Sequence, residues 1–80
     1  MNFVDVITDV ESGALTICET FEVDSEFIPQ HEDELALDFG DVVYVASVKN
    51  GWCDGYNIGN KKRGKFPTSV VRHVKNLHVL

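Results

Sequence analysis

The chain has 80 residues, of which 44% are hydrophobic and 10% aromatic, and its formal net charge at pH 7 is -6. This length suits one small globular domain and excludes a second, and the apolar fraction argues against a disordered tail because enough surface can be buried to offset the entropy lost on ordering. No run of about 18 apolar residues is present to span a membrane, and the N-terminus lacks the basic-then-apolar layout of a signal peptide. We therefore expect a cytoplasmic protein.

Charge is distributed unevenly along the chain. Residues 1–48 hold 12 of the 13 acidic residues and no lysine or arginine. Residues 49–80 hold all 7 basic residues and a single acid, Asp54. This asymmetry predicts a surface with two signs of charge, unless folding interleaves the two halves.

The N-terminal residues alternate between apolar and polar side chains in two runs. Apolar residues fall mainly at even positions in Val4–Val10 and at odd positions from Leu15 to Val23, with Glu11-Ser12-Gly13 between the runs. Two runs of period two that are joined by a glycine-containing turn predict a β-hairpin.

A polar loop and two strands are predicted next. Residues 24–34, DSEFIPQHEDE, are acidic and carry Pro29 in the middle, which favours an exposed loop over a strand. Residues 35–39 alternate again, and Val42–Val48 is a β-branched run typical of a central strand. Gly40 suits a tight turn, so we expect it to join two strands.

The remaining residues predict two more turns and a short helix. Asn50-Gly51 is a hairpin signal, the run Trp52–Ile58 leads to a second signal in GNKK, and Arg63–Phe66 would return as the partner strand. Pro67 ends that strand, PTS suits one tight helical turn, and VVRHV resumes β character. Short strands at this spacing predict a compact all-β barrel.

The order of these motifs resembles an SH3 (Src-homology 3) domain over about Val23–Val74. The motifs are HEDELALDFGD, a β run, GW at a hairpin turn, RGKFP and a final VV. FIPQHEDEL and GYN....RG.FP look closest to the SH3 domains of JNK-pathway scaffold proteins, and the second also resembles that of the phosphoinositide 3-kinase regulatory subunit. The resemblance implies an SH3 domain over residues 23–75 of a larger protein, with a hairpin extension at 1–22 and a tail at 76–80.

The resemblance also implies a small five-stranded barrel with a defined core. Gly55 is expected to lie where two strands cross closely, at a position that has no room for a side chain. The implied core residues are Val23, Leu35, Leu37, Val43, Val45, Phe66 and Val71.

Trp52 is the residue that the resemblance places in a peptide groove. A sole tryptophan in a small domain is more often core, but the adjacent Asn50-Gly51 turn and Asp54 favour the surface. SH3 domains typically bind proline-rich segments in the polyproline II conformation, with aromatic slots for the prolines and loop acids for a flanking Arg or Lys. In the family this tryptophan divides the groove and presents an apolar face and one N–H donor.

The groove departs from the family pattern in three places. Ser25 and Val70 stand where tyrosines are expected, and Ser69 replaces an asparagine, whereas Phe27 and Pro67 keep their apolar surface. Ordinary PxxP segments should therefore bind weakly or not at all. The implied peptide-binding residues are Ser25, Phe27, His31, Glu32, Asp33, Glu34, Trp52, Pro67, Ser69 and Val70.

Two functions stay open at this point. The first is a non-catalytic interaction module of an adaptor, scaffold or signalling protein, in which the acidic loop and the Trp52 ring hold a basic segment that need not contain PxxP. A merely solvated loop is the alternative for these acids. The second function is structural: the domain self-associates, for instance as a homodimer, or packs on a neighbouring domain through its flattened groove, its hairpin edge or the apolar tail NLHVL.

Other kinds of site find little support. There is no nucleophile elbow, HExxH or P-loop, and the cysteines Cys18 and Cys53 and the histidines lack a ligand spacing, so we expect no enzyme, metal, cofactor or small-molecule substrate. Lys61-Lys62-Arg63, followed by Lys65, is interpreted as a solubilising hairpin tip rather than a nucleic-acid or membrane site.

His31 raises the hypothesis of pH-dependent binding. It lies next to Glu32 and Asp33, and a positive charge on its ring would weaken the attraction of these acids for a basic ligand. This predicts tighter binding at pH 8 than at pH 6, and a flat profile would leave His31 an ordinary exposed histidine.

Overall fold

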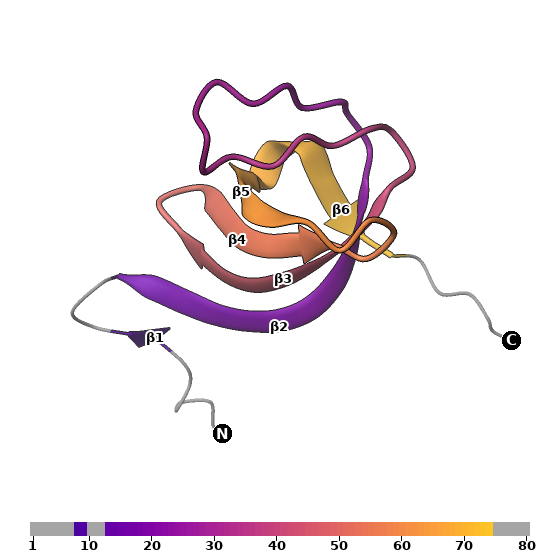
Figure 1. The fold of residues 1–80 in the computed structure, drawn as a ribbon. Helices are drawn as coiled ribbons and strands as arrows, with labels where there is room; N and C mark the ends of the chain where they lie inside the picture. The colour runs from indigo at the N-terminus through magenta and orange to yellow at the C-terminus, as the bar shows by residue number, and fades with distance from the viewer. Residues whose placement is uncertain (1–7, 10–12, 75–80) are drawn as a thin grey trace, which may run out of the picture.

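The computed structural model describes residues 8–9 and 13–74, which form six β-strands and one short 3-10 helix (Figure 1). The elements are β1 (Thr8–Asp9), β2 (Ala14–Val23), β3 (Val42–Lys49), β4 (Trp52–Asn57), β5 (Arg63–Pro67), the 3-10 helix η1 (Thr68–Val70) and β6 (Val71–His73). The predicted helical turn is confirmed. It covers Thr68–Val70, one residue later than the predicted PTS segment, and Pro67 is its N-cap.

The N-terminal hairpin is confirmed where the structure describes it. β1 pairs antiparallel with β2, with Thr8 opposite Leu15 and Asp9 opposite Ala14, and Gly13 has a φ of 75° that suits the turn. The alternating residues 4, 6 and 10 of the first predicted run lie outside the described residues. β2 also pairs with β3 and β6, so this one strand belongs to both the hairpin and the barrel. The division at residues 22 and 75 stays a prediction.

The sheet curls into the small five-stranded barrel that the resemblance implied, with β1 as the additional strand of the N-terminal hairpin. The strand order is β1-β2-β3-β4-β5, and β6 returns to pair with β2, all antiparallel. In Figure 1 β2 curves along the lower side of the barrel, below β3 and β4, and the loop of residues 24–41 arches over the upper side. Register shifts between Thr16 and Glu19 and between Val45 and Ser47 mark irregularities at which strands bend.

The core agrees with the predicted one except at its C-terminal end. Val71 is only partly buried and packs against the cluster, whereas its neighbour Val70 is buried, because the 3-10 turn points Val70 inward. Cys53 is also buried, on the inward-facing side of β4. The buried apolar residues are Val23, Leu35, Leu37, Val43, Val45, Cys53, Phe66 and Val70.

The strand predicted at residues 35–39 is wrong. This segment belongs to the loop and makes one isolated bridge, in which Phe27 and Leu37 exchange backbone hydrogen bonds of 2.9 and 3.0 Å. Pro29 lies in the facing segment and has no N–H with which to continue a ladder. Phe39 is 73% exposed, because the chain turns at Gly40, whose φ is 90°.

Both predicted hairpin turns are present. Asn50 and Gly51 have φ values of 53° and 84°, the two positive values that a tight turn of this sequence needs. In the loop of residues 58–62 the positive φ falls on Lys61, at 66°, and not on Gly59.

The second hairpin is tied to the turn at Gly40 by a buried amide. Asn57 is 4% exposed, and its side chain donates to Asp41 Oδ2 at 2.9 Å and accepts from Gly59 N at 2.8 Å. A buried polar group is costly when unpaired, so breaking either hydrogen bond would be unfavourable and the amide holds both turns together. These turns lie at the end of β4 opposite to Trp52, which is its first residue.

Gly55 provides a test of strand crossing. A Cβ atom added there would overlap the carbonyl oxygen of Tyr44 on β3. We expect Gly55→Ala to lower the free energy of unfolding by about 3 kcal/mol or more, because overpacking against backbone finds little relief. Urea denaturation followed by tryptophan fluorescence measures the change.

Gly59→Ala is the matched control, since its new Cβ would meet only Asn57 Oδ1, at 3.2 Å. This variant should lose less than about 1 kcal/mol. Equal stability of the two variants would contradict the steric role of Gly55.

Candidate functional site

The acidic loop is held against β5 by its backbone. Leu35 N donates to Lys65 O at 2.9 Å, and Lys65 N donates to Asp33 O, also at 2.9 Å. Leu35 and Leu37 are 4% and 1% exposed, so the loop is anchored in the core at two points. The acids that precede Leu35 are therefore placed beside β5.

Within the loop, the acids divide into two kinds. Glu34 is half-buried, and its Oε1 accepts from Gln30 N at 2.7 Å, so this carboxylate shapes the loop itself. Glu32 and Asp33 are exposed and form no ion pair with any described residue. His31 is exposed as well, and its carbonyl accepts from Glu34 N at 3.1 Å. Glu32 and Asp33 are the carboxylates open to a ligand.

Trp52 lies on the surface beside this loop. It is 39% exposed, directly after the Asn50-Gly51 turn. Its ring meets the ring of Phe27 edge to face, with centroids 6.0 Å apart and planes at 74°. Pro67 is its partner across β4 and β5. The structure thus brings together three of the predicted apolar groove residues, in an arrangement that aromatic pairs prefer.

The remaining predicted residues lie around η1. Asp24 N donates to Val70 O at 2.8 Å, which joins the end of β2 to the helix, and Thr68 N donates to Gly51 O at 2.9 Å, which joins the helix to the Trp52 turn. Ser25 and Ser69 are exposed. Val70 is 9% exposed and belongs to the core cluster, so it contributes little surface next to the groove.

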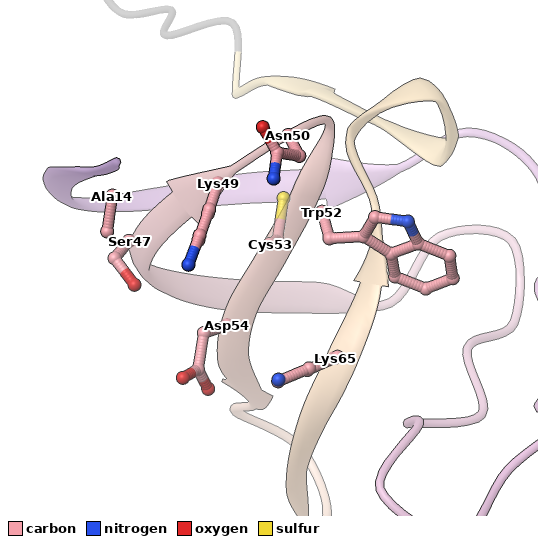
Figure 2. Close-up of a pocket in the computed structure, with 8 residues that line it drawn as sticks. All are labelled: Ala14, Ser47, Lys49, Asn50, Trp52, Cys53, Asp54 and Lys65. Carbon is pink, nitrogen blue, oxygen red and sulfur yellow. The ribbon is translucent and has the colours of Figure 1, made fainter. Parts of the chain in front are cut away.

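A pocket of about 330 Å³ lies beside Trp52 and is lined by residues of β2, β3, β4 and β5 and of the Asn50-Gly51 turn. Figure 2 shows the Trp52 ring turned away over β5 and the amines of Lys49 and Lys65 turned toward the space around Asp54. Trp52, Cys53 and Ala14 also line it. Its polar lining residues are Ser47, Lys49, Asn50, Asp54 and Lys65.

The sequence analysis did not predict this pocket, although the pairing of β3, β4 and β5 indicates which residues share its surface. Lys49 faces Trp52 across the two-residue turn, and Asp54 faces Lys65. Side chains opposite each other in an antiparallel pair share a face, so the hairpin register alone puts these residues on one surface. Lys65 therefore lies on the face of β5 that lines the pocket, apart from the basic hairpin tip at Lys61–Arg63.

The two thiols are in different environments. Cys18 is free and exposed, at a residue of β2 whose φ is 54°. A hydrogen bond with Cys18 is the main cause that raises the pKa of Tyr44. Cys53 is free and buried, and this burial raises the pKa of its thiol to about 11.

Residues 8–9 and 13–74 contain neither a cluster of metal ligands nor a membrane-spanning helix. No group of three or more His, Cys, Asp or Glu side chains there is arranged to hold a metal ion. No helix in the same residues has the length and hydropathy to cross a membrane.

Known proteins resemble this chain over its barrel. A family described as the variant SH3 domain matches residues 23–72. JNK-interacting protein 1 of Drosophila melanogaster is 38% identical over 47 residues, which are 58% of this chain and 10% of that protein. CD2-associated protein of Homo sapiens is 41% identical over 51 residues, 62% of this chain and 8% of that protein. The solved SH3 domain of yeast NBP2 matches with a TM-score of 0.65 and 26% identity, over 71% of this chain and 98% of that one.

The barrel and these matches define a protein-interaction module of the SH3 type. The chain belongs to the variant SH3 domain family. It spans about a tenth or less of the length of the two curated relatives named above.

The cysteines allow a test of the described burial. Iodoacetamide at pH 8 should modify Cys18 and spare Cys53, which is 2% exposed and whose thiol has a pKa raised by burial. Only the thiolate reacts, and with a pKa of about 11 roughly a thousandth of Cys53 is ionised at that pH. Intact mass and peptide mapping against time measure the two rates.

In urea both cysteines should react, because the barrier is burial. If Cys53 in the folded protein reacted as fast as Cys18, the packing described for β4 would be incorrect.

Proposed function

We propose that the domain binds an extended protein segment that carries Arg or Lys, through a groove formed by Phe27, Trp52 and Pro67 and bordered by the acidic loop. The observation that carries this proposal is the exposed Trp52, held edge to face against Phe27. A large ring kept at the surface and supported from one side offers a rigid apolar contact with little entropy left to lose.

The acidic loop supplies the charge for a basic residue. Glu32 and Asp33 are exposed and unpaired within the described residues, so a ligand guanidinium can approach either carboxylate without breaking an internal ion pair. A charge-assisted hydrogen bond of this kind is stronger than a neutral one. The Trp52 ring adds an aromatic face for the same cation.

The groove differs from a proline-binding one in its outer walls. Ser25 and Ser69 are short and exposed, and Val70 is buried. The positions where the family has tyrosines therefore offer a ligand little apolar contact surface. The two slots that would hold prolines are incomplete, whereas the carboxylates that would hold a basic residue are present. We infer an affinity in the micromolar range or weaker, about -8 kcal/mol at most, since a shallow groove gains little surplus over the cost of association.

The relatives agree with a protein ligand. The names JNK-interacting protein 1 and CD2-associated protein describe proteins that associate with other proteins. This chain matches only a small part of each, so their partners are not transferred to it.

Self-association is the second candidate function. It is favoured by large apolar side chains on the surface, among them Ile28 at 64% and Phe39 at 73% exposure. Sedimentation at increasing concentration tests this candidate. A dimer that Trp52→Ala disrupts would favour self-association through the groove, and a monomer at high concentration would exclude it.

The test of peptide binding is an NMR titration with two peptides, one proline-rich with a flanking Arg and one basic without PxxP. We expect amide shifts at Phe27, Trp52 and residues 31–34, larger with the basic peptide. Trp52→Ala should weaken binding about tenfold or more, as loss of a central aromatic contact does. Glu32→Gln and Asp33→Asn should each weaken binding about two- to fivefold, as loss of an exposed charge pair does.

Phe39→Ala is the matched control, because it removes an exposed ring at the turn near Asp41 and Asn57 and not at the groove. It should leave binding unchanged. If the amide shifts of the groove residues do not change with either peptide at millimolar concentration, the proposal is overturned.

A further inference from the structure

The pocket beyond Trp52 carries a charge opposite to that of the acidic loop. Lys49 and Lys65 line it with a single carboxylate, Asp54. Neither lysine lies within 4.0 Å of a carboxylate among the described residues, so both amines are available to a ligand. Lys65 and Asp54 are cross-strand partners, and Figure 2 shows the two amines directed toward the same space.

The pocket continues the groove. Trp52 lines the pocket and also contacts Phe27 of the groove, so the tryptophan stands between the two regions. The hairpin turn at Asn50-Gly51 has only two residues, and thus no long loop rises between the pocket and solvent on that side. A segment that lies across Trp52 reaches both the acids and the lysines.

The span between the two charged regions follows from the pairing. Glu34 is bridged to Lys65 on β5, β5 pairs with β4, and β4 pairs with β3, which ends at Lys49. Lys65 is therefore one neighbouring-strand step of about 4.8 Å from Glu34, and Lys49, at the far end of the pocket, is three steps or about 14 Å away. A segment in the polyproline II conformation advances about 3.1 Å per residue and covers this distance in about five residues.

We infer that this pocket binds an Asp or Glu side chain of the same segment whose basic residue is held by the acidic loop. The inference rests on the proposed function and narrows its ligand to one that carries both charges, about five positions apart. Lys49 and Lys65 attract the carboxylate, Ser47 offers a hydroxyl donor, and Asp54 opposes the contact. Asp54 therefore limits the affinity.

The experiment compares peptides that differ in one residue. Each carries an Arg and, five positions away on either side, a Glu or the isosteric Gln. In the order that fits the groove, the Glu peptide should bind about two- to fivefold more tightly than the Gln peptide, the gain expected for an exposed charge pair. That gain should fall at higher salt. A peptide with Glu next to Arg brings the carboxylate near Lys65 but not near Lys49, so its gain should be smaller.

Variants of the pocket residues test whether the higher affinity of the Glu peptide, the gain, depends on the pocket. Lys49→Gln and Lys65→Gln should each reduce it, whereas Asp54→Asn should enlarge it, and none of the three should change the affinity of the Gln peptide by more than about twofold. Lys62→Gln is the matched control, because Lys62 is an exposed lysine in the loop after β4. It should leave the gain unchanged.

The outcomes separate this inference from the proposed function. If both peptides bind equally, or if the gain persists in Lys49→Gln and Lys65→Gln, the pocket does not bind a carboxylate, while the groove is retained. If neither peptide binds, both proposals are overturned. A short single-stranded oligonucleotide is the last probe, and shifts at Lys49 and Lys65 with it but not with the Glu peptide would overturn the inference in favour of phosphate.

Discussion

The contact between the acidic loop and β5 places the candidate acidic binding residues beside the barrel. Two backbone hydrogen bonds join Asp33, Leu35 and Lys65. Gly64 permits this approach, since a Cβ there would lie 3.0 Å from both Asp33 O and Leu35 N. The loop is held by backbone and by buried leucines, and so its carboxylates do not have to hold it in place. Glu32 and Asp33 can then remain exposed and unpaired beside the barrel, which a loop fixed by its own ion pairs would not allow.

Trp52 links the parts of this surface because of its position in β4. It follows a two-residue turn whose positive φ values only a few residue types adopt readily, so the strand begins at a defined point. From that point the two-residue period directs Cys53 and Gly55 inward, and Trp52 and Asp54 outward. The close crossing at Gly55 in the middle of β4 brings β3 and β4 together. The position of the exposed ring is therefore set by the same strand that fills the core.

The sequence predicted the features that depend on local pattern. The all-β barrel and the Asn50-Gly51 turn followed from period-two runs and turn residues, whereas most of the core and the groove position of Trp52 followed from the resemblance to SH3 domains, with the turn before Trp52 as further support for a surface position. Features that depend on which segments meet in space were missed. Residues 35–39 alternate like a strand, but their neighbour contains Pro29 and the ladder stops after one bridge. Val70 replaced Val71 in the core, because a single 3-10 turn shifts which side chain faces inward. The pocket required the register of three strands.

The charge asymmetry of the chain takes a particular form once folded. Among the described residues, the acidic first half meets the basic second half where Glu22 pairs with Arg72 at 3.1 Å and where the acidic loop lies along Lys65. Interleaving thus brings the two signs of charge together along β5, while Glu32 and Asp33 stay exposed in the loop and Lys49 and Lys65 line the pocket beside Trp52. A uniformly basic segment across this surface meets the lysines, and a nucleic acid meets the carboxylates. On the proposed surface each of these ligands would be opposed by charges of its own sign, so weak individual contacts would still discriminate between ligands.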